Sequence, residues 1–338
     1  MYETPPDRYQ ILSLDGGGIK GLFAAAILAQ LEEDLATTVA DHFDLIVGTS
    51  AGGIIALGLG AGLRPREMVE FFARDGQSIF GNPLGWRTLR RYWKRKYSHE
   101  PLKAALQRCL GDRRLADSKK ALVVPSYNLD RDDVYLFKTP HHPRLVRDGK
   151  QPMWRVGLAT SAAPTYFPAC CEVDHIRLID GGIWANNPAM VGVVEAVSMF
   201  NIPLDAISVL SISTTTPAIE RAASLSGGGL WQWKPAAIDV ALRGQSRGVQ
   251  AQVQHLIGPE RAIRLDAVVA DRVFDIDKLS EKRLLSEAAS ASRAFSPTFT
   301  AKFAQHLAPE FRPMIPQNGH SNSQNVAAGF GIEAAATK

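Results

Sequence analysis

Residues 9–21 read YQILSLDGGGIKG, an apolar run that leads directly into a glycine-rich segment. Gly16, Gly18 and Gly21 fit the spacing G-x-G-x-x-G, which in a strand-to-helix turn is typical of dinucleotide binding. The same exposed backbone N–H groups and helix dipole can also stabilise an oxyanion. The segment therefore predicts a strand, a tight turn and a helix, and it leaves open which kind of anion the turn binds.

The end of the next predicted strand decides between these two interpretations. Dinucleotide sites of this type carry an acidic residue there, about 20 positions beyond the glycines, to hold the ribose. Residues 43–52 instead read FDLIVGTSAG, with the pattern G-x-S-x-G between Gly48 and Gly52. This pattern places a serine on a tight strand-to-helix turn that exposes its hydroxyl, so Ser50 is the predicted nucleophile. The predicted oxyanion hole is formed by Gly16, Gly17 and Gly18.

The histidines are poorly placed to act as the base that a serine nucleophile needs. His42 precedes the strand that Ser50 follows, so the two lie about 20 Å apart at about 3.3 Å per residue. His175 likewise stands at the wrong end of its predicted strand. His141 and His142 lie in a polar segment and are predicted to be solvated.

A carboxylate does end a predicted strand at the correct edge of the sheet. Asp180 follows the strand predicted at 176–179 and precedes Gly181 and Gly182. A carboxylate can accept the serine proton directly, and the glycines leave room for a substrate. The sequence therefore predicts a Ser50–Asp180 dyad. The other role that aspartate often takes, a cap on the following turn, stays open.

The composition places the chain among globular proteins. It has 338 residues and a formal net charge of +4, which is compatible with an anionic partner but does not require one. The N-terminus shows no signal-peptide pattern, and the longest apolar runs are shorter than the roughly 20 residues that span a bilayer. Cys109, Cys170 and Cys171 lack metal-ligand spacing, so we expect reduced, buried thiols and no metal. These features favour a cytoplasmic protein that meets lipid only from the aqueous side.

Strand and helix patterns alternate along the first half of the chain, which predicts an α/β fold with a mainly parallel sheet covered by helices on both faces. Predicted strands cover 11–14, 43–47, 121–125, 134–138, 176–179 and 207–212, and the last is expected to close the sheet. Predicted helices cover 22–35, a segment from 51 onward, 238–256 and 278–303. We expect a core at 9–215, a mainly helical C-terminal extension at 216–316 and a flexible tail at 317–338.

Three motifs, in this order, resemble those of the patatin-like phospholipase family. They are Asp15-Gly16-Gly17-Gly18-Ile19-Lys20-Gly21, Gly48-Thr49-Ser50-Ala51-Gly52 and Asp180-Gly181-Gly182, and the similarity takes in Ser161-Ala162-Ala163-Pro164 and Asn186-Asn187-Pro188. The resemblance covers residues 9–215. It implies a three-layer α/β/α sandwich related to α/β-hydrolases, a Ser–Asp dyad without histidine, no cofactor, and hydrolysis of phospholipids or other acyl lipids. Lys20 stands where the family usually has arginine, so the charge is kept and the bidentate fork is lost.

A further similarity connects the chain to the cyclic-nucleotide-activated phospholipases of bacterial antiphage defence. The compact length, the first strand near residue 10 and residues 135–142, YLFKTPHH, look like that subgroup. The resemblance implies an enzyme that binds a cyclic di- or oligonucleotide, assembles into a homo-oligomer and degrades phospholipid at the inner membrane. No nucleic acid polymer is expected as a partner. Candidate contacts for the phosphates of the activator are Arg243, Arg247, Arg261 and Arg264.

Two further points stay open. Residues 86–97, WRTLRRYWKRKY, form a basic amphipathic pattern that suits an anionic membrane surface, a subunit contact, or a helix that docks its aromatic residues into the core. The other function classes are a constitutive esterase or lipase of lipid turnover and a non-catalytic assembly protein on the same fold. The intact Ser50 and Asp180 argue against the non-catalytic alternative.

Overall fold

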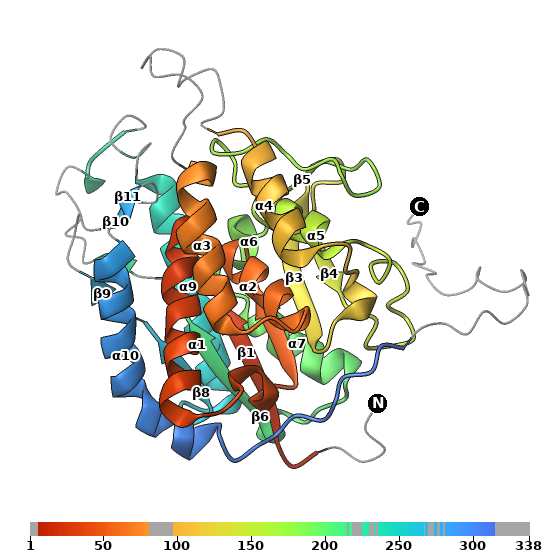
Figure 1. The fold of residues 1–338 in the computed structure, drawn as a ribbon, viewed down its shortest axis with the longest axis vertical. Helices are drawn as coiled ribbons and strands as arrows, with labels where there is room; N and C mark the ends of the chain where they lie inside the picture. Colours follow the sequence, from red (N-terminus) through yellow and green to blue (C-terminus); the bar gives the residue numbers. More distant parts are fainter. Residues whose placement is uncertain are drawn as a thin grey trace, which may run out of the picture.

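The computed structural model describes residues 6–80, 97–214, 216–217, 225–229, 233, 236–266, 268–269, 274–275, 278–279 and 281–314. Within these residues a seven-stranded mixed sheet lies between two layers of helices (Figure 1). Its strands are β1 (Tyr9–Leu14), β2 (Leu45–Gly48), β3 (Ala121–Asn128), β4 (Asp133–Lys138), β5 (Leu178–Asp180), β6 (Ile207–Ile212) and β8 (Ala262–Leu265). Two short pairs lie outside this sheet, β7 (Thr216–Pro217) with β9 (Val268–Val269) and β10 (Phe274–Asp275) with β11 (Lys278–Leu279).

The α-helices that cover the sheet are α1 (Gly21–Leu35), α2 (Ala51–Gly60), α3 (Pro65–Phe80), α4 (Glu100–Leu110), α5 (Met153–Thr160), α6 (Gly182–Ala185), α7 (Ala189–Met199), α9 (Ala237–Ile257) and α10 (Glu281–Lys302). Short 3-10 helices are η1 (Gly18–Lys20), η2 (Val39–His42), η4 (Leu115–Asp117) and η5 (Leu204–Ala206). The predicted helices at 22–35, 238–256 and 278–303 correspond closely to α1, α9 and α10.

The order of the strands brings the two glycine motifs together. The strand order is β4-β3-β2-β1-β6-β8, with β5 also paired to β3. The five neighbouring strands β3, β2, β1, β6 and β8 are mutually parallel. In the register of β1 and β2, Leu14 lies opposite Gly48. The turn that follows β1 and the turn that carries Ser50 therefore leave the same edge of the sheet side by side, as expected for the carboxyl ends of neighbouring parallel strands.

Both faces of the sheet are buried, which explains why its central strands read as nearly continuous apolar runs. In β1, Leu12 and Leu14 join the larger core cluster with α1, α2, α3 and α10, whereas Tyr9 and Ile11 join a second cluster with α7 and α9. This alternation follows the period of two of a β-strand. The three-layer α/β/α architecture is thereby confirmed.

The structure corrects the predicted ends of the sheet. The strand at Ile207–Ile212 does not close it, because β8 pairs in parallel with β6 and continues the sheet into the segment predicted to be a helical extension. The strand β5 is also shorter than predicted and runs antiparallel to β3, with Asp180 opposite Ser126. Asp180 therefore lies at the expected edge of the sheet, although its strand runs antiparallel to β3 rather than parallel to it.

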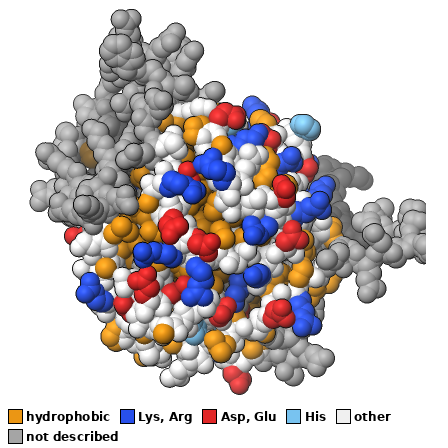
Figure 2. Space-filling view, viewed as in Figure 1, with side chains coloured by type: hydrophobic (Ala, Val, Ile, Leu, Met, Phe, Trp, Pro, Cys, Tyr) orange, Lys and Arg blue, Asp and Glu red, His pale blue; other side chains and the backbone are white. Residues whose placement is uncertain are grey.

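Acidic and basic side chains are interspersed over the face seen in Figure 2, in keeping with the small net charge. No helix among the described residues is both long and apolar enough to span a membrane. Residues 86–96 of the basic aromatic segment and the tail at 317–338 lie outside the described residues. Tyr97 at the end of that segment is buried against Phe80 and Phe167. The prediction of three buried thiols is correct for Cys170 alone, since Cys109 is half-buried and Cys171 is exposed.

Candidate active site

Ser50 occupies a strained turn between β2 and α2. Its backbone has φ 55° and ψ −121°, a combination that a residue with a side chain adopts rarely and at a cost of about 1–3 kcal/mol. The flanking glycines make the turn possible: a Cβ on Gly48 would lie 2.3 Å from the carbonyl oxygen of Gly52, and one on Gly52 would lie 2.3 Å from that of Leu14. Only glycine fits at either position, so the sequence pattern G-x-S-x-G has a direct steric basis.

Ser50 donates a hydrogen bond of 2.7 Å from Oγ to Oδ2 of Asp180. The other carboxylate oxygen, Oδ1, accepts a hydrogen bond of 2.7 Å from the backbone N–H of Gly182. Both side chains are largely buried, with 8% of Ser50 and 7% of Asp180 exposed. Burial raises the pKa of Asp180 to about 6, although the hydrogen bonds from Ser50 and Gly182 act in the opposite direction. The predicted pair is therefore in contact, and its carboxylate is a stronger base than an exposed one.

Thr160, at the end of α5, fixes the backbone of the serine turn and was not predicted from the sequence. Its Oγ1 accepts a hydrogen bond of 2.9 Å from the N–H of Ser50 and donates one of 2.6 Å to the carbonyl of Pro125 on β3. The N–H of Ser50 is thus already used and cannot bind a substrate. Thr160 directly precedes Ser161-Ala162-Ala163-Pro164, and Ala162 accepts a hydrogen bond from the N–H of Asp180. This motif therefore supports both members of the pair.

The glycine loop after β1 lies beside Ser50, but its three N–H groups are not equivalent. Gly16 donates its N–H to the carbonyl of Asn186 at 2.9 Å, so it is not available as the oxyanion donor that the sequence predicts. A Cβ on Gly16 would lie 3.3 Å from Cβ of Ser50. For the N–H groups of Gly17 and Gly18, no acceptor is found among the described residues. Two of the three predicted donors therefore remain.

The remaining motif residues support these turns. Gly21 begins α1, and a Cβ atom at this position would lie 2.7 Å from the Cβ of Ala51. Because glycine has no Cβ, α1 and α2 can approach closely here. Gly181 passes the β3 backbone in the same way, with a Cβ position 2.3 Å from the carbonyl oxygen of Pro125. Lys20 ends η1 and is half-buried, and Asp15 is buried directly after β1.

The helix α9 holds the loop that follows Asp180. Asn186 donates a hydrogen bond of 3.0 Å to Oγ of Ser246, and the Asn187 side chain donates one of 3.2 Å to the backbone carbonyl of Ser246. The N–H of Asn187 also donates to Oε1 of Gln245 at 3.2 Å. The two asparagines belong to a motif visible in the sequence, whereas Gln245 and Ser246 have no spacing relationship to it and were not predicted.

The histidines do not approach Ser50 through any hydrogen bond in the described part of the chain. His42 bonds to Thr37 and to the backbone carbonyl of His306. The prediction that His141 is solvated is wrong: it is 3% exposed, and its Nε2 lies 2.8 Å from Oε1 of Glu195. No cluster of three or more potential metal ligands occurs within the described ranges.

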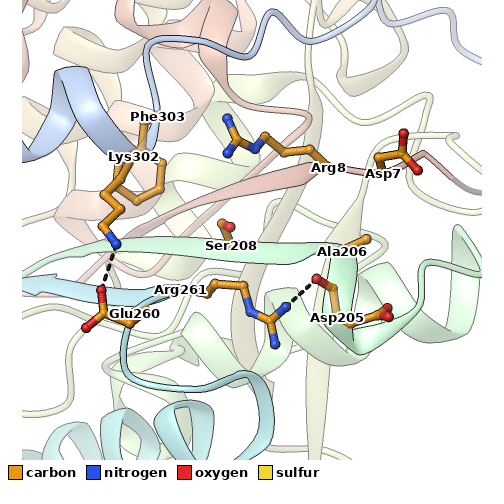
Figure 3. A pocket seen from close by; sticks show the side chains of 9 residues that line it. All are labelled: Asp7, Arg8, Asp205, Ala206, Ser208, Glu260, Arg261, Lys302 and Phe303. Carbon is orange, nitrogen blue, oxygen red and sulfur yellow. Dashed lines mark hydrogen bonds and ion pairs between the residues drawn. The ribbon is translucent and has the colours of Figure 1, made fainter.

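A cavity of about 240 Å³ opens at the edge of the sheet opposite to Ser50 (Figure 3). It lies near the starts of β1, β6 and β8 and the end of α10, and two of its basic residues are already bonded. Lys302 pairs with Glu260 at 2.7 Å, and Arg261 donates to the backbone carbonyls of Asp205 and Ile257. Among the predicted phosphate contacts, Arg243 likewise pairs with Asp239 and Arg264 with Asp15. Arg247 is exposed on α9.

Comparisons with known proteins identify the family of this chain. The family model described as "Patatin-like phospholipase" matches residues 12–193. A protein named cGAMP-activated phospholipase from Pseudomonas aeruginosa (strain BWHPSA011 / Pa011) is 34% identical over 275 residues, which cover 80% of this chain and 82% of the relative. Relatives of the same name from Escherichia coli (strain TW11681) and Vibrio cholerae are 35% and 37% identical over 66% and 57% of this chain, and over 67% and 59% of their own lengths.

A solved structure extends the comparison to the fold. VipD from Legionella pneumophila matches over 87% of this chain and 67% of its own, with a TM-score of 0.50 and 12% sequence identity. At that identity the match supports the architecture alone. The family match spans both glycine turns and Asp180, and the P. aeruginosa relative aligns along most of both chains. This chain therefore belongs to the patatin-like phospholipase family.

Proposed function

We propose that this protein is a serine acyl hydrolase that releases fatty acids from membrane phospholipids through Ser50 and Asp180. The observation that carries the proposal is the 2.7 Å hydrogen bond from Ser50 Oγ to the buried Asp180 carboxylate, at a serine held in a strained turn. Strain of this kind is maintained where the surrounding structure fixes a side chain for chemistry. Membership of the family supplies the substrate class.

The proposed reaction has two steps. Ser50 Oγ attacks the acyl carbonyl carbon while Asp180 accepts the serine proton, and the tetrahedral oxyanion is bound by the N–H groups of Gly17 and Gly18. Collapse of this intermediate forms the acyl-serine ester, breaks the bond to the lysolipid oxygen and returns the proton to that oxygen. Water, deprotonated by Asp180, then attacks the acyl-serine carbonyl; the bond from that carbon to Ser50 Oγ breaks, Asp180 returns the proton to Oγ, and the fatty acid is released. Each step returns Asp180 to its ionised form, so a single carboxylate serves both.

The names of the relatives favour control by a cyclic dinucleotide, and we include this in the proposal. The activator would promote assembly of an active homo-oligomer at the inner face of the membrane, and the enzyme would otherwise remain cytoplasmic. The non-catalytic alternative does not explain the contact between Ser50 and Asp180. A constitutive lipase would use the same dyad and differs only in needing no activator.

One experiment tests both parts of the proposal. Fatty-acid release from vesicles of zwitterionic and anionic phospholipid is measured with wild-type protein, alone and with each of a panel of cyclic dinucleotides. We expect one of them to raise the rate about 5- to 150-fold, the usual range for coupling between two sites. Equal rates with every nucleotide would contradict the activation but not the hydrolase. Absence of release, together with failure of a fluorophosphonate to label Ser50 under all conditions, would contradict the hydrolase itself.

The pH dependence of the rate should report the ionisation of Asp180. Because only the ionised carboxylate can accept the serine proton, and its pKa is raised to about 6, kcat/KM should be constant above about pH 7. Below about pH 6 it should fall, approaching about tenfold for each further pH unit. The measurement is the hydrolysis of a soluble short-chain ester between pH 5 and 8, with circular dichroism at each pH as the control for folding. A flat profile across this range with the fold intact would exclude Asp180 as the base.

A further inference from the structure

Arg264 makes a buried ion pair at the base of the glycine loop. Its Nη2 lies 2.7 Å from Oδ2 of Asp15 and its Nη1 lies 3.3 Å from Oδ1, so the guanidinium contacts both carboxylate oxygens. Only 13% of the Arg264 side chain and 3% of the Asp15 side chain are exposed. Arg264 is on β8, outside residues 12–193 to which the family model applies, so the match assigns it no role.

The guanidinium reaches Asp15 across the end of β6, the strand that separates β8 from β1. In the register of the sheet, Ser211 on β6 lies opposite Arg264 on one side and opposite Ser13 on the other. Arg264 Nη1 donates a hydrogen bond of 2.7 Å to Oγ of Ser211, and Nε lies 3.7 Å from the Asp266 carboxylate. These contacts fix the plane of the guanidinium as well as its position.

Asp15 and Gly16 are the anchored residues that directly precede the two N–H groups proposed to bind the oxyanion. Its backbone N–H donates to the carbonyl of Ile212 at 3.1 Å, and the next residue, Gly16, is held at both its N–H and its carbonyl, the latter by Thr214 Oγ1 at 3.0 Å. Gly17 and Gly18 carry no side chain, and their carbonyls accept hydrogen bonds from the N–H groups of Lys20 and Gly21. The direction of their N–H groups is therefore set by Asp15 and Gly16 on one side and by the turn of η1 on the other.

The charges in this region explain why the pair contains arginine. Asp15 is buried, and without a cation its carboxylate would be driven toward the neutral form, which accepts hydrogen bonds less well. A buried ion pair contributes little net stability compared with apolar packing, so its use here points to geometry rather than to stability. Arginine offers two parallel donors to the two carboxylate oxygens, which a lysine ammonium cannot do.

We infer that Arg264 is a positioning residue for the oxyanion hole: by holding both oxygens of Asp15, it sets the direction of the Gly17 and Gly18 N–H groups toward the developing oxyanion. The inference rests on the proposed function. It also gives a segment outside the family match a part in the chemistry, because Arg264 lies on β8, which pairs with β6. Arg264 itself touches no reacting atom.

The test compares Arg264→Gln and Arg264→Lys with wild type, under the activator conditions that give wild type its highest rate. A displacement of about 1 Å at a catalytic group can lower a rate by about 100-fold, so we expect Arg264→Gln to lower kcat by about 100-fold while KM changes by less than about threefold. Arg264→Lys restores the charge without the fork and should recover only part of kcat. Phosphonylation of Ser50 by a fluorophosphonate should slow in parallel, since its transition state uses the same N–H groups.

Arg64→Gln is the matched control for loss of an ion pair. Arg64 lies 2.9 Å from the carboxylate of Glu32, whose side chain is 7% exposed, and the other hydrogen bonds of the two side chains go to Thr38 and Val39. This variant should keep the wild-type kcat even where its melting temperature falls. The double variant Asp15→Asn/Arg264→Gln should be no slower than the slower single variant, because both changes remove the same interaction.

The outcomes separate this inference from the proposed function. Wild-type kcat and labelling rate in folded Arg264→Gln would overturn the positioning role while leaving Ser50 and Asp180 in place. A rise in KM with unchanged kcat would assign Arg264 to substrate binding and would also overturn it. If Arg264→Gln does not fold, Ser211→Ala, which removes one hydrogen bond to the guanidinium, should still lower kcat several-fold, and an unchanged kcat there would contradict the inference. Hydrolysis that persists in Ser50→Ala would instead refute the proposed function.

Discussion

Replacing Ser50 by alanine should reduce fatty-acid release by about 10,000-fold or more, because removal of the nucleophile from a catalytic unit abolishes the covalent pathway and leaves only binding and the oxyanion donors. The effect should fall on kcat rather than KM, since Oγ forms its bond only as the transition state is reached. Fatty-acid release from phospholipid vesicles and fluorophosphonate labelling are the two measurements, and labelling should disappear entirely.

Two further serine variants control for structural effects. Ser118 is buried and hydrogen-bonded to the carbonyl of Lys120 before β3, so Ser118→Ala removes a comparable hydroxyl remote from the site and should retain the wild-type rate. Ser50→Gly should be as inactive as Ser50→Ala but more stable than it by about 1 kcal/mol, because glycine adopts φ 55° without strain. Residual activity of Ser50→Ala near the wild-type level would identify a different nucleophile.

The sequence predicted the parts of the site that depend on close approaches of the backbone. Gly48 and Gly52 are required because any side chain there would collide with a carbonyl oxygen, and such a requirement leaves a local pattern that can be read without a structure. The order of two strand-turn-helix units then places both turns at one edge of a parallel sheet. The positions of Ser50 and the glycine loop could therefore be predicted from the motif spacing alone.

The residues that hold these turns in place could not be predicted in the same way. Thr160, Ser246 and Arg264 reach the site from segments distant in the sequence, and each does so with a single hydroxyl or guanidinium. A single polar side chain at the end of a helix or on a short strand is common on protein surfaces, so nothing in its local pattern indicates a partner. Such residues are found only when the tertiary structure brings the segments together.

The errors about strands and histidines have similar causes. The strand β8 is four residues long and includes Arg264, so it lacks the apolar run by which the longer strands were recognised. His141 was predicted to be solvated because its sequence neighbours are polar, yet its partner Glu195 lies on α7, 54 positions along the chain. The direction of β5 depends on the path of the loop that precedes it. The sequence of a strand of only three residues does not indicate that path.

Replacing Asp180 by asparagine should lower kcat by about 100- to 10,000-fold, the usual contribution of a general base, and should at the same time stabilise the fold at neutral pH. Asparagine can keep the geometry, since its Oδ1 can accept from the Gly182 N–H and its Nδ2 can donate to Ser50 Oγ. What it loses is the negative charge that accepts the serine proton. Fatty-acid release and thermal unfolding of the same preparation measure the two effects.

The sign of the stability change follows from the pKa. Burial raises the pKa of Asp180 from 3.8 in the unfolded chain to about 6 in the fold, so at pH 7 the folded state carries an ionised carboxylate that it disfavours by about 3 kcal/mol. Asp180→Asn removes this cost, so its gain in unfolding free energy should be full above pH 7, roughly half at pH 5, about a fifth at pH 4 and absent near pH 3. Burial without a cationic partner thus has two effects on the Asp180 carboxylate: it makes the group a stronger base, and it lowers the stability of the fold at neutral pH.

Asp75→Asn distinguishes this effect from the general consequence of changing a buried carboxylate. Asp75 is also buried, but Arg74 and Arg108 pair with it at 2.9 and 2.8 Å, so its charge is compensated and its replacement should destabilise the fold. Asp180 has no cationic partner among the described residues, and its carboxylate accepts hydrogen bonds from the Ser50 hydroxyl and the Gly182 backbone N–H. Loss of stability in Asp180→Asn at pH 7, with unchanged activity, would mean that Asp180 caps the following turn rather than acting as the base. A gain in stability with loss of activity would show that the uncompensated charge is kept for the reaction.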